Sequence, residues 1–241
     1  MGVAGIAAVS EGAVSVEAAV VSAAAARRGA GKNMSALLSN EEQSRLTRQI
    51  AEVERSTAGE LVTVVLHKSA SYAEFRLGFA SMLALLLVCV AHLLWPWVAA
   101  MELLGAQALL AVALYWILGR AALLRCITPR AAQEKAVGDR VKQLFIELGV
   151  TETRDRSGVL ILMSALERRV EILGDRGIHE HLGTEAWQAM VSTITQAARG
   201  GAAAEGLSRI IEQLGRQLSA RFPACPDDIN ELPDRILTDD G

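Results

Sequence analysis

The feature that most constrains this chain is a pair of long uncharged runs near its middle. Residues 77–101 contain no Asp, Glu, Lys or Arg, and neither do residues 103–119. A helix that crosses the hydrocarbon core of a bilayer needs about 20 predominantly apolar residues. We therefore predict two transmembrane helices, Leu77 to Trp95 and Val98 to Gly119. The alternative, a very apolar helix pair buried in a soluble core, is disfavoured because a domain of this size needs no such run.

The residues around the two runs indicate a hairpin and its orientation. Trp95-Pro96-Trp97 places a helix breaker and two interfacial aromatic residues between the runs, and the connecting turn holds one charged residue, Glu102. The outer flanks carry Lys68, Arg76, Arg120, Arg125 and Arg130. Because cytoplasmic flanks are enriched in Lys and Arg, we expect both flanks and both termini in the cytoplasm, with the lipid bilayer of an inner or plasma membrane as the first partner.

Composition excludes several classes of function. The chain is 51% hydrophobic and still 21% charged, so apolar and charged stretches are segregated into membrane and water-soluble parts. A net charge of -3 offers no basic face, and we expect no nucleic-acid partner. Cys89, Cys126 and Cys225 form no CxxC or His-paired spacing. Neither a disulfide framework nor a zinc site is therefore predicted.

The segment before the membrane runs predicts a helix followed by a strand. Ser39 and Glu42 have the spacing of a capping box, which starts a helix that runs to about Ser56 with one apolar stripe. Residues 60–66 are short, apolar and rich in β-branched side chains, which favours a buried strand.

The segment after the membrane runs predicts a helix, two strands and two further helices. Residues 133–149 have helical apolar spacing, with Gly149 as the C-terminal stop. Residues 158–163 read as a central strand and residues 169–173 as its neighbour, joined by a connection short enough for a hairpin. Two amphipathic helices follow, around Trp187 to Ile194 and Leu207 to Leu218.

The two ends of the sequence are interpreted differently from the rest. Residues 1–33 have their positive charges after the apolar stretch, which is the reverse of a secretory signal. We expect either a disordered tail or residues translated from too early a start. Residues 224–241 are expected to form a loose acidic tail.

Several short motifs resemble the TPM domain family, in particular its bacterial membrane-protein branch, which is related to thylakoid-lumen and photosystem II repair proteins. The resemblance covers residues 35–67 and 131–223, and its most specific part is Arg169 to Ile178. The other parts are Leu38 to Glu42, Glu54 to Glu60, Ser157 to Ile161, Trp187, Gly206-Leu207 and Arg221 to Pro223. The resemblance implies an α/β fold: a mixed sheet between helical layers, with the hairpin of residues 77–119 as an insertion.

The strongest candidate for chemistry is Asp175, which follows a buried strand at a Gly-Asp-Arg-Gly turn. His179, Glu180 and His181 follow within six residues, and His67 ends the first strand. We predict a divalent-cation site for magnesium or calcium from Asp175, His179 and His67, if the fold brings them together. The structural alternative is that Asp175 accepts backbone hydrogen bonds in its turn while the histidines are solvated.

Two functions follow. The first is a membrane-anchored interaction or assembly module, which binds a protein partner on the cytoplasmic face of a bacterial membrane. The alternative is a divalent-metal-assisted phosphatase centred on Asp175, because the resemblance implies phosphatase activity, which is attributed to one plant member. Many members carry an Asp shortly before the first helix, whereas residues 33–36 here lack a carboxylate, which weakens the metal site. Small residues in both runs also leave homo-oligomerisation open.

Overall fold

The structure is a computed structural model, and it forms two compact units. One unit comprises residues 1–69 and 136–241, and the other comprises residues 70–135. Each unit is considered by itself. The described residues are 14–15, 38–153, 155–178, 187, 189–190, 192–194, 196–197, 202–224 and 236–239. Apart from Val14 and Ser15, the tail predicted for residues 1–33 lies outside them.

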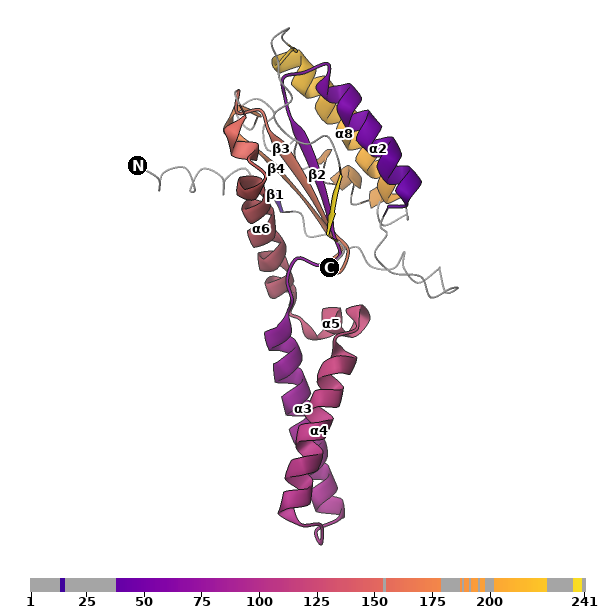
Figure 1. Cartoon of the computed structure of the whole chain (residues 1–241), viewed down its shortest axis with the longest axis vertical. Helices are drawn as coiled ribbons and strands as arrows, with labels where there is room; N and C mark the ends of the chain where they lie inside the picture. The colour runs from indigo at the N-terminus through magenta and orange to yellow at the C-terminus, as the bar shows by residue number, and fades with distance from the viewer. Residues whose placement is uncertain are drawn as a thin grey trace, which may run out of the picture. The chain divides into compact units, whose positions relative to one another are not determined.

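A mixed β-sheet forms the centre of the first unit, as predicted (Figure 1). Its core strands are β2 (Leu61–Leu66), β3 (Val159–Ser164) and β4 (Arg169–Gly174). β2 and β3 run parallel although about ninety residues separate them, while β3 and β4 form the predicted antiparallel hairpin. Two short strands complete the order β1-β4-β3-β2-β5, namely β1 (Val14–Ser15) and β5 (Leu237–Asp239).

Helices cover both faces of this sheet. α2 (Asn40–Glu54) and α8 (Ala203–Arg221) pack on one face, against the side chains of residues such as Leu61 and Ile161. α6 (Arg130–Glu147) covers the other face, where it contacts alternate residues such as Val62 and Leu160. This alternation explains why β2 and β3 read as continuous apolar runs, since both of their faces are buried.

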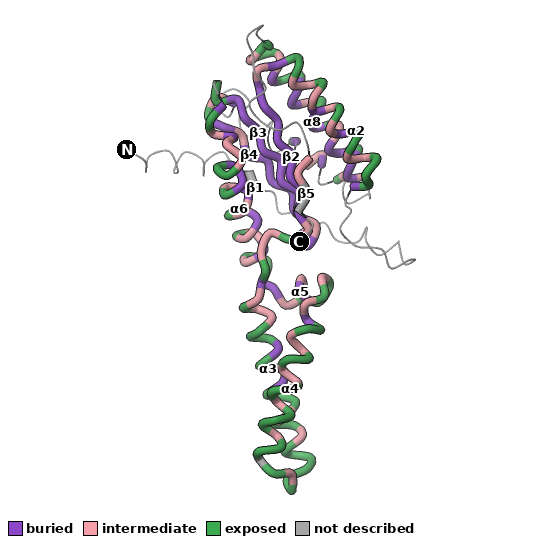
Figure 2. Tube along the Cα trace, viewed as in Figure 1, coloured by how far each residue is buried: buried purple, intermediate pink, exposed green. Residues whose placement is uncertain are grey.

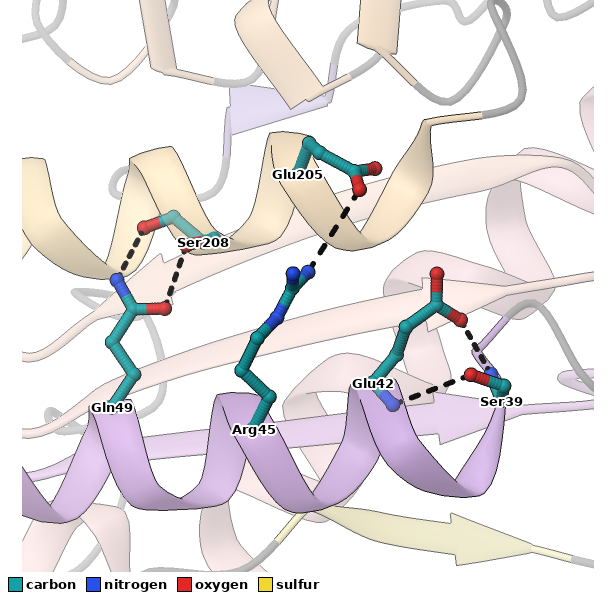
Figure 3. Close-up of polar contacts among 6 residues, drawn as sticks. All are labelled: Ser39, Glu42, Arg45, Gln49, Glu205 and Ser208. Carbon is teal, nitrogen blue, oxygen red and sulfur yellow. Dashed lines mark hydrogen bonds and ion pairs between the residues drawn. The ribbon is translucent and has the colours of Figure 1, made fainter.

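Side-chain contacts explain how α2 begins and how it pairs with α8 (Figure 3). The Ser39 hydroxyl accepts from the Glu42 backbone N–H at 3.3 Å, and a Glu42 carboxylate oxygen accepts from the Ser39 N–H at 2.6 Å. The predicted capping box is therefore confirmed. Gln49 bonds both the hydroxyl and the backbone carbonyl of Ser208 on α8, at 2.7 and 2.9 Å. This double contact fixes the register of the two helices.

The second unit is a helical hairpin with a short third helix. α3 (Ala73–Leu94) and α4 (Ala100–Leu118) pack against each other, close to the two predicted runs. Most of their positions are exposed (Figure 2). α5 (Ala121–Ile127), which contacts both helices, was not predicted because it is only seven residues long. Both long helices meet the length and apolarity that a membrane span requires.

Three further sequence expectations can be compared with the structure. Gly149 has a φ of 69°, which lies in the left-handed region, and it follows the end of α6 at Glu147, so it stops the helix as predicted. The helix starts at Arg130, three residues before the predicted start. The described residues around Trp187 are helical, and Trp187, Met190 and Ile194 are buried. The prediction of a loose tail over residues 224–241 is wrong at Leu237–Asp239, which form β5. The reason is that β2 would otherwise present an unpaired edge, and Leu237 packs into the core beside α6.

Candidate functional site

Asp175 lies directly after β4, at the end of the sheet where β2 and β3 begin. Its backbone N–H donates to the Gly158 carbonyl at 2.9 Å, which extends the strand pairing by one step. The side chain is only 6% exposed. Oδ1 accepts from the Arg176 backbone N–H at 2.7 Å, whereas Oδ2 is buried and has no hydrogen-bond partner among the described residues.

The surroundings of this carboxyl disfavour its charged form. Burial raises the pKa of Asp175 above its ordinary value of 3.8. The backbone N–H of Arg176 and the positive charges of Arg156 and Arg176 lower the pKa, but less strongly. A carboxyl in this state holds its proton to a higher pH, so it can act as a proton donor, and it could bind a cation only after losing that proton.

Close backbone packing builds the walls around Asp175. A Cβ at Gly174 would lie 2.8 Å from the ring of Trp187, and one at Gly177 would lie 2.7 Å from the carbonyl oxygen of Arg156. These contacts explain the two glycines of the Gly-Asp-Arg-Gly turn. Trp187 Nε1 and Thr153 Oγ1, from segments at this end of the sheet, are also buried without hydrogen-bond partners among the described residues.

The structure does not bring His67 and Asp175 together. β2 and β3 are parallel, so His67 follows the strand pair Leu66 and Ser164. β4 runs in the opposite direction, and its end at Gly174 pairs with Val159, at the start of β3. Since a strand rises about 3.3 Å per residue, His67 and Asp175 are separated by roughly 20 Å along the sheet. The predicted metal site consists of Asp175, His179 and His67. Its two described members, Asp175 and His67, are therefore too far apart to bind the same ion.

The remaining predicted ligands cannot complete the site from what the structure describes. His179, Glu180 and His181 lie outside the described residues. Among the residues that are described, no group of three His, Cys, Asp or Glu side chains could hold a metal ion. Asp175 Oδ2 has the chemistry of a ligand for magnesium or calcium, but one oxygen is not a site.

A polar cluster at the His67 end of the sheet was missed by the sequence reasoning. The Ser164 hydroxyl at the end of β3 donates to Glu167 in the β3–β4 turn, and it accepts from the Ser69 hydroxyl at 3.0 Å. Ser69 also donates its backbone N–H to the second oxygen of Glu167 at 3.0 Å. Ser164 is 1% exposed and Glu167 5%, so the Ser164 hydroxyl is enclosed within the cluster and its role there is structural. A glutamate in a short turn is normally solvated, and the sequence carries no signal of its burial.

The arginines near the strand ends are also divided between the two ends of the sheet. Arg168 and Arg169 lie beside the β3–β4 turn, whereas Arg176 lies beside Asp175. They do not form one phosphate-binding group.

Comparisons with known proteins agree with the fold. Residues 122–217 match the family model described as TPM domain, which confirms the resemblance to this family over that part of the chain. The match includes β3, β4 and Asp175. Among solved structures, the NMR structure of BA42 protein from the psychrophilic bacterium Bizionia argentinensis has a TM-score of 0.53 at 21% identity. It covers 84% of this chain and 95% of its own, and at this identity it shows the fold alone. No curated protein matches this sequence.

Proposed function

Because the chain carries a TPM domain, we propose that it is a membrane-anchored TPM-domain protein that acts as an interaction or assembly module on the cytoplasmic face of a bacterial membrane. In this proposal α3 and α4 cross the inner or plasma membrane as a hairpin. The sheet and its helices stay in water and bind a protein partner. The hairpin fixes the place of action, and the soluble unit supplies the binding surface.

The observation that carries the proposal is the exposure of the apolar side chains on α3 and α4. A core helix of a soluble protein would be mostly buried, but only 11% and 6% of the apolar windows in these two helices are. Exposing so many large apolar side chains to water is unfavourable, and a bilayer removes that cost. The exposed set includes Leu77, Phe79, Met82, Leu85, Leu86, Leu87, Val90, Leu93, Leu94, Met101, Leu104, Leu109, Val112, Trp116 and Ile117.

The aromatic residues support the same placement. Trp95 and Trp97 flank the turn between α3 and α4 and are 50% and 77% exposed. Tyr115 and Trp116 lie at the other end of α4, with their rings in a T-shaped arrangement. Tryptophan and tyrosine are enriched at both interfaces of membrane proteins, so these two belts mark the levels where the hairpin would leave the hydrocarbon core.

Chain connectivity and charge both support cytoplasmic placement of the soluble unit. β2 precedes the hairpin and β3 follows it, yet the two strands are neighbours in one sheet. Both ends of the hairpin must therefore emerge on the same side of the membrane. The cations at those ends, from Lys68 to Arg130, favour the cytoplasmic side.

Membrane insertion and topology can be tested on the full chain. We expect the expressed protein to stay in the membrane pellet through alkaline carbonate extraction and to leave it in detergent. A reporter fused at Gly241 should be active in the cytoplasm, and a reporter in the turn of residues 97–102 should be active outside. Release by carbonate would overturn the anchor, and the opposite reporter pattern would overturn the orientation.

The alternative function, a metal-assisted phosphatase, has one observation in its favour: Oδ2 of the buried Asp175 carboxyl has no hydrogen-bond partner among the described residues. Its test is hydrolysis of a phosphomonoester by the full-length protein with magnesium or calcium, beside calorimetry with each ion. Metal-dependent turnover that Asp175→Asn abolishes and the exposed-site variant Asp155→Asn leaves intact would replace the module proposal. No heat with either ion at millimolar concentration would eliminate the phosphatase.

A further inference from the structure

One end of the helical unit gathers three arginines, from the start of α3 and from α5. Arg76 lies in the first turn of α3, Arg120 is the residue that precedes α5, and Arg125 lies in the last turn of α5. The acidic residues near this end are Glu74, in the first turn of α3, and Glu134. Against them stand Arg76, Arg120, Arg125, Arg130 and Lys135, so this end of the unit has a positive balance.

Contacts with α4 fix the Arg76 side chain in place. Its Nη2 donates to the Tyr115 carbonyl at 3.0 Å, and its guanidinium carbon lies 4.1 Å from the centre of the Tyr115 ring. A Cβ at Gly119 would come within 2.5 Å of Nη2, so glycine leaves the space that the guanidinium fills. Because Gly119 directly precedes Arg120, the packing of the Arg76 guanidinium on Gly119 also sets where the chain turns into α5. The positive charge is therefore held at the junction of the three helices.

The lengths of the two long helices place these arginines at a headgroup level. The 18 residues after Arg76 in α3 rise roughly 27 Å at 1.5 Å per residue, and Met101–Leu118 of α4 rise the same distance. The hydrocarbon core of a bilayer is about 30 Å thick. If the turn near Trp97 lies at one interface, the arginines lie at the other.

α5 has the surface of a helix that lies in an interface. It packs against both α3 and α4, and Leu124 is its one buried residue. Leu123 is 38% exposed, and Ala122 and Cys126 are exposed as well. Arg120 is exposed at its start. Apolar side chains next to arginines suit the boundary between acyl chains and phosphates.

We propose that Arg76, Arg120 and Arg125, here called the arginine collar, bind the headgroups of anionic phospholipids. The proposal rests on the membrane-anchored function proposed above. The exposed Arg120 guanidinium can donate paired hydrogen bonds that match the oxygens of a phosphodiester. Arg76, whose Nη2 donates to Tyr115, contributes its charge, which complements a lipid of net negative charge better than a zwitterionic one. The collar couples the hairpin to anionic lipid and so favours membranes rich in it.

The test uses the full chain in nanodiscs of phosphatidylcholine with increasing amounts of phosphatidylglycerol. Native mass spectrometry then counts the lipids that stay bound after release. We expect phosphatidylglycerol to be retained in preference, and the preference to weaken as salt is raised. The double variant Arg120→Gln, Arg125→Gln should lower the preference about fivefold for each arginine. The matched control Arg48→Gln, Arg55→Gln removes two exposed arginines of the other unit and should leave it unchanged.

Each outcome decides between the two proposals. Equal retention of both lipids by the wild type, or an unchanged preference in the double variant, overturns the collar and leaves the anchor intact, provided the protein resists carbonate extraction. Extraction by carbonate overturns the anchor and the collar together. If the double variant does not fold, the salt titration of the wild type decides, because a preference that persists at high salt contradicts a charge-based site.

Discussion

Ser164 and Glu167 are joined by a buried side-chain hydrogen bond across the turn between β3 and β4. The same hydroxyl accepts from Ser69, which follows β2, so three polar side chains close this end of the sheet. β2 is the strand that the chain leaves to enter the helical unit. The cluster therefore links Ser69, which precedes the helical unit in the chain, to β3 and the β3–β4 turn, which follow that unit in the chain.

Replacing Ser164 with alanine should destabilise the soluble unit by about 1–3 kcal/mol, since it leaves buried groups of Glu167 and Ser69 without that hydroxyl. The measurement is the free energy of unfolding from denaturant titration in detergent. Ser44→Ala is the control, because the Ser44 hydroxyl is exposed and bonds a carbonyl of its own helix. Equal stability of the two variants would contradict a structural role for the cluster.

Two helical glycines give opposite predictions for the same substitution. A Cβ at Gly215 in α8 would lie 2.6 Å from Val53 Cγ1 and 3.3 Å from its Cβ, so the methyl group of Gly215→Ala must push α2 and α8 apart. Overpacking of this kind costs about 1–3 kcal/mol. A Cβ at Gly138 in α6 would meet its nearest neighbour, Glu171, at an ordinary 3.9 Å.

Gly138→Ala should therefore stabilise the protein by roughly 0.5–1 kcal/mol through helix propensity, while Gly215→Ala destabilises it. Thermal unfolding of both variants against the wild type measures the difference. Stabilisation by both substitutions would show that α2 and α8 are not closely packed at Gly215, and destabilisation by both would contradict the open surroundings of Gly138.

The capping box at the start of α2 predicts a graded result at Ser39. Ser39→Ala removes the acceptor for the Glu42 backbone N–H and should cost about 0.5–2 kcal/mol. Ser39→Asp restores a side-chain acceptor at the same place and should recover most of the loss. Denaturant unfolding of the two variants distinguishes the cap from a general effect of substitution, which would destabilise both alike.

The fold followed from local patterns, but the site did not. Uncharged length predicted the hairpin, and apolar runs bounded by turns predicted β2, β3 and β4, because both signals are confined to a few neighbouring residues. The relation of Asp175 to His67 depends on which strands are parallel. β4 returns antiparallel from its hairpin and carries Asp175 to the end opposite His67. No sequence feature near Asp175 or His67 indicates which strands pair in parallel.

The pH dependence of stability should change when Asp175 loses its charge. Burial raises the pKa of this carboxyl above its ordinary 3.8, so the folded state favours the protonated form. The stabilisation from the raised pKa is fully present below pH 3.8 and is lost as the pH rises through the folded-state pKa. Asp175→Asn keeps a neutral group of similar shape at every pH, so its stability does not fall as the pH rises through this range.

We therefore expect Asp175→Asn to match the wild type in acid and to become the more stable of the two as the pH rises above that window. Denaturant titrations over a pH series measure the difference in unfolding free energy at each point. Asp155→Asn, at an exposed position, is the control and should give a difference without this slope. An Asp175→Asn variant that loses stability relative to the wild type as the pH rises would mean that the site stabilises a charged carboxylate, as a bound cation would.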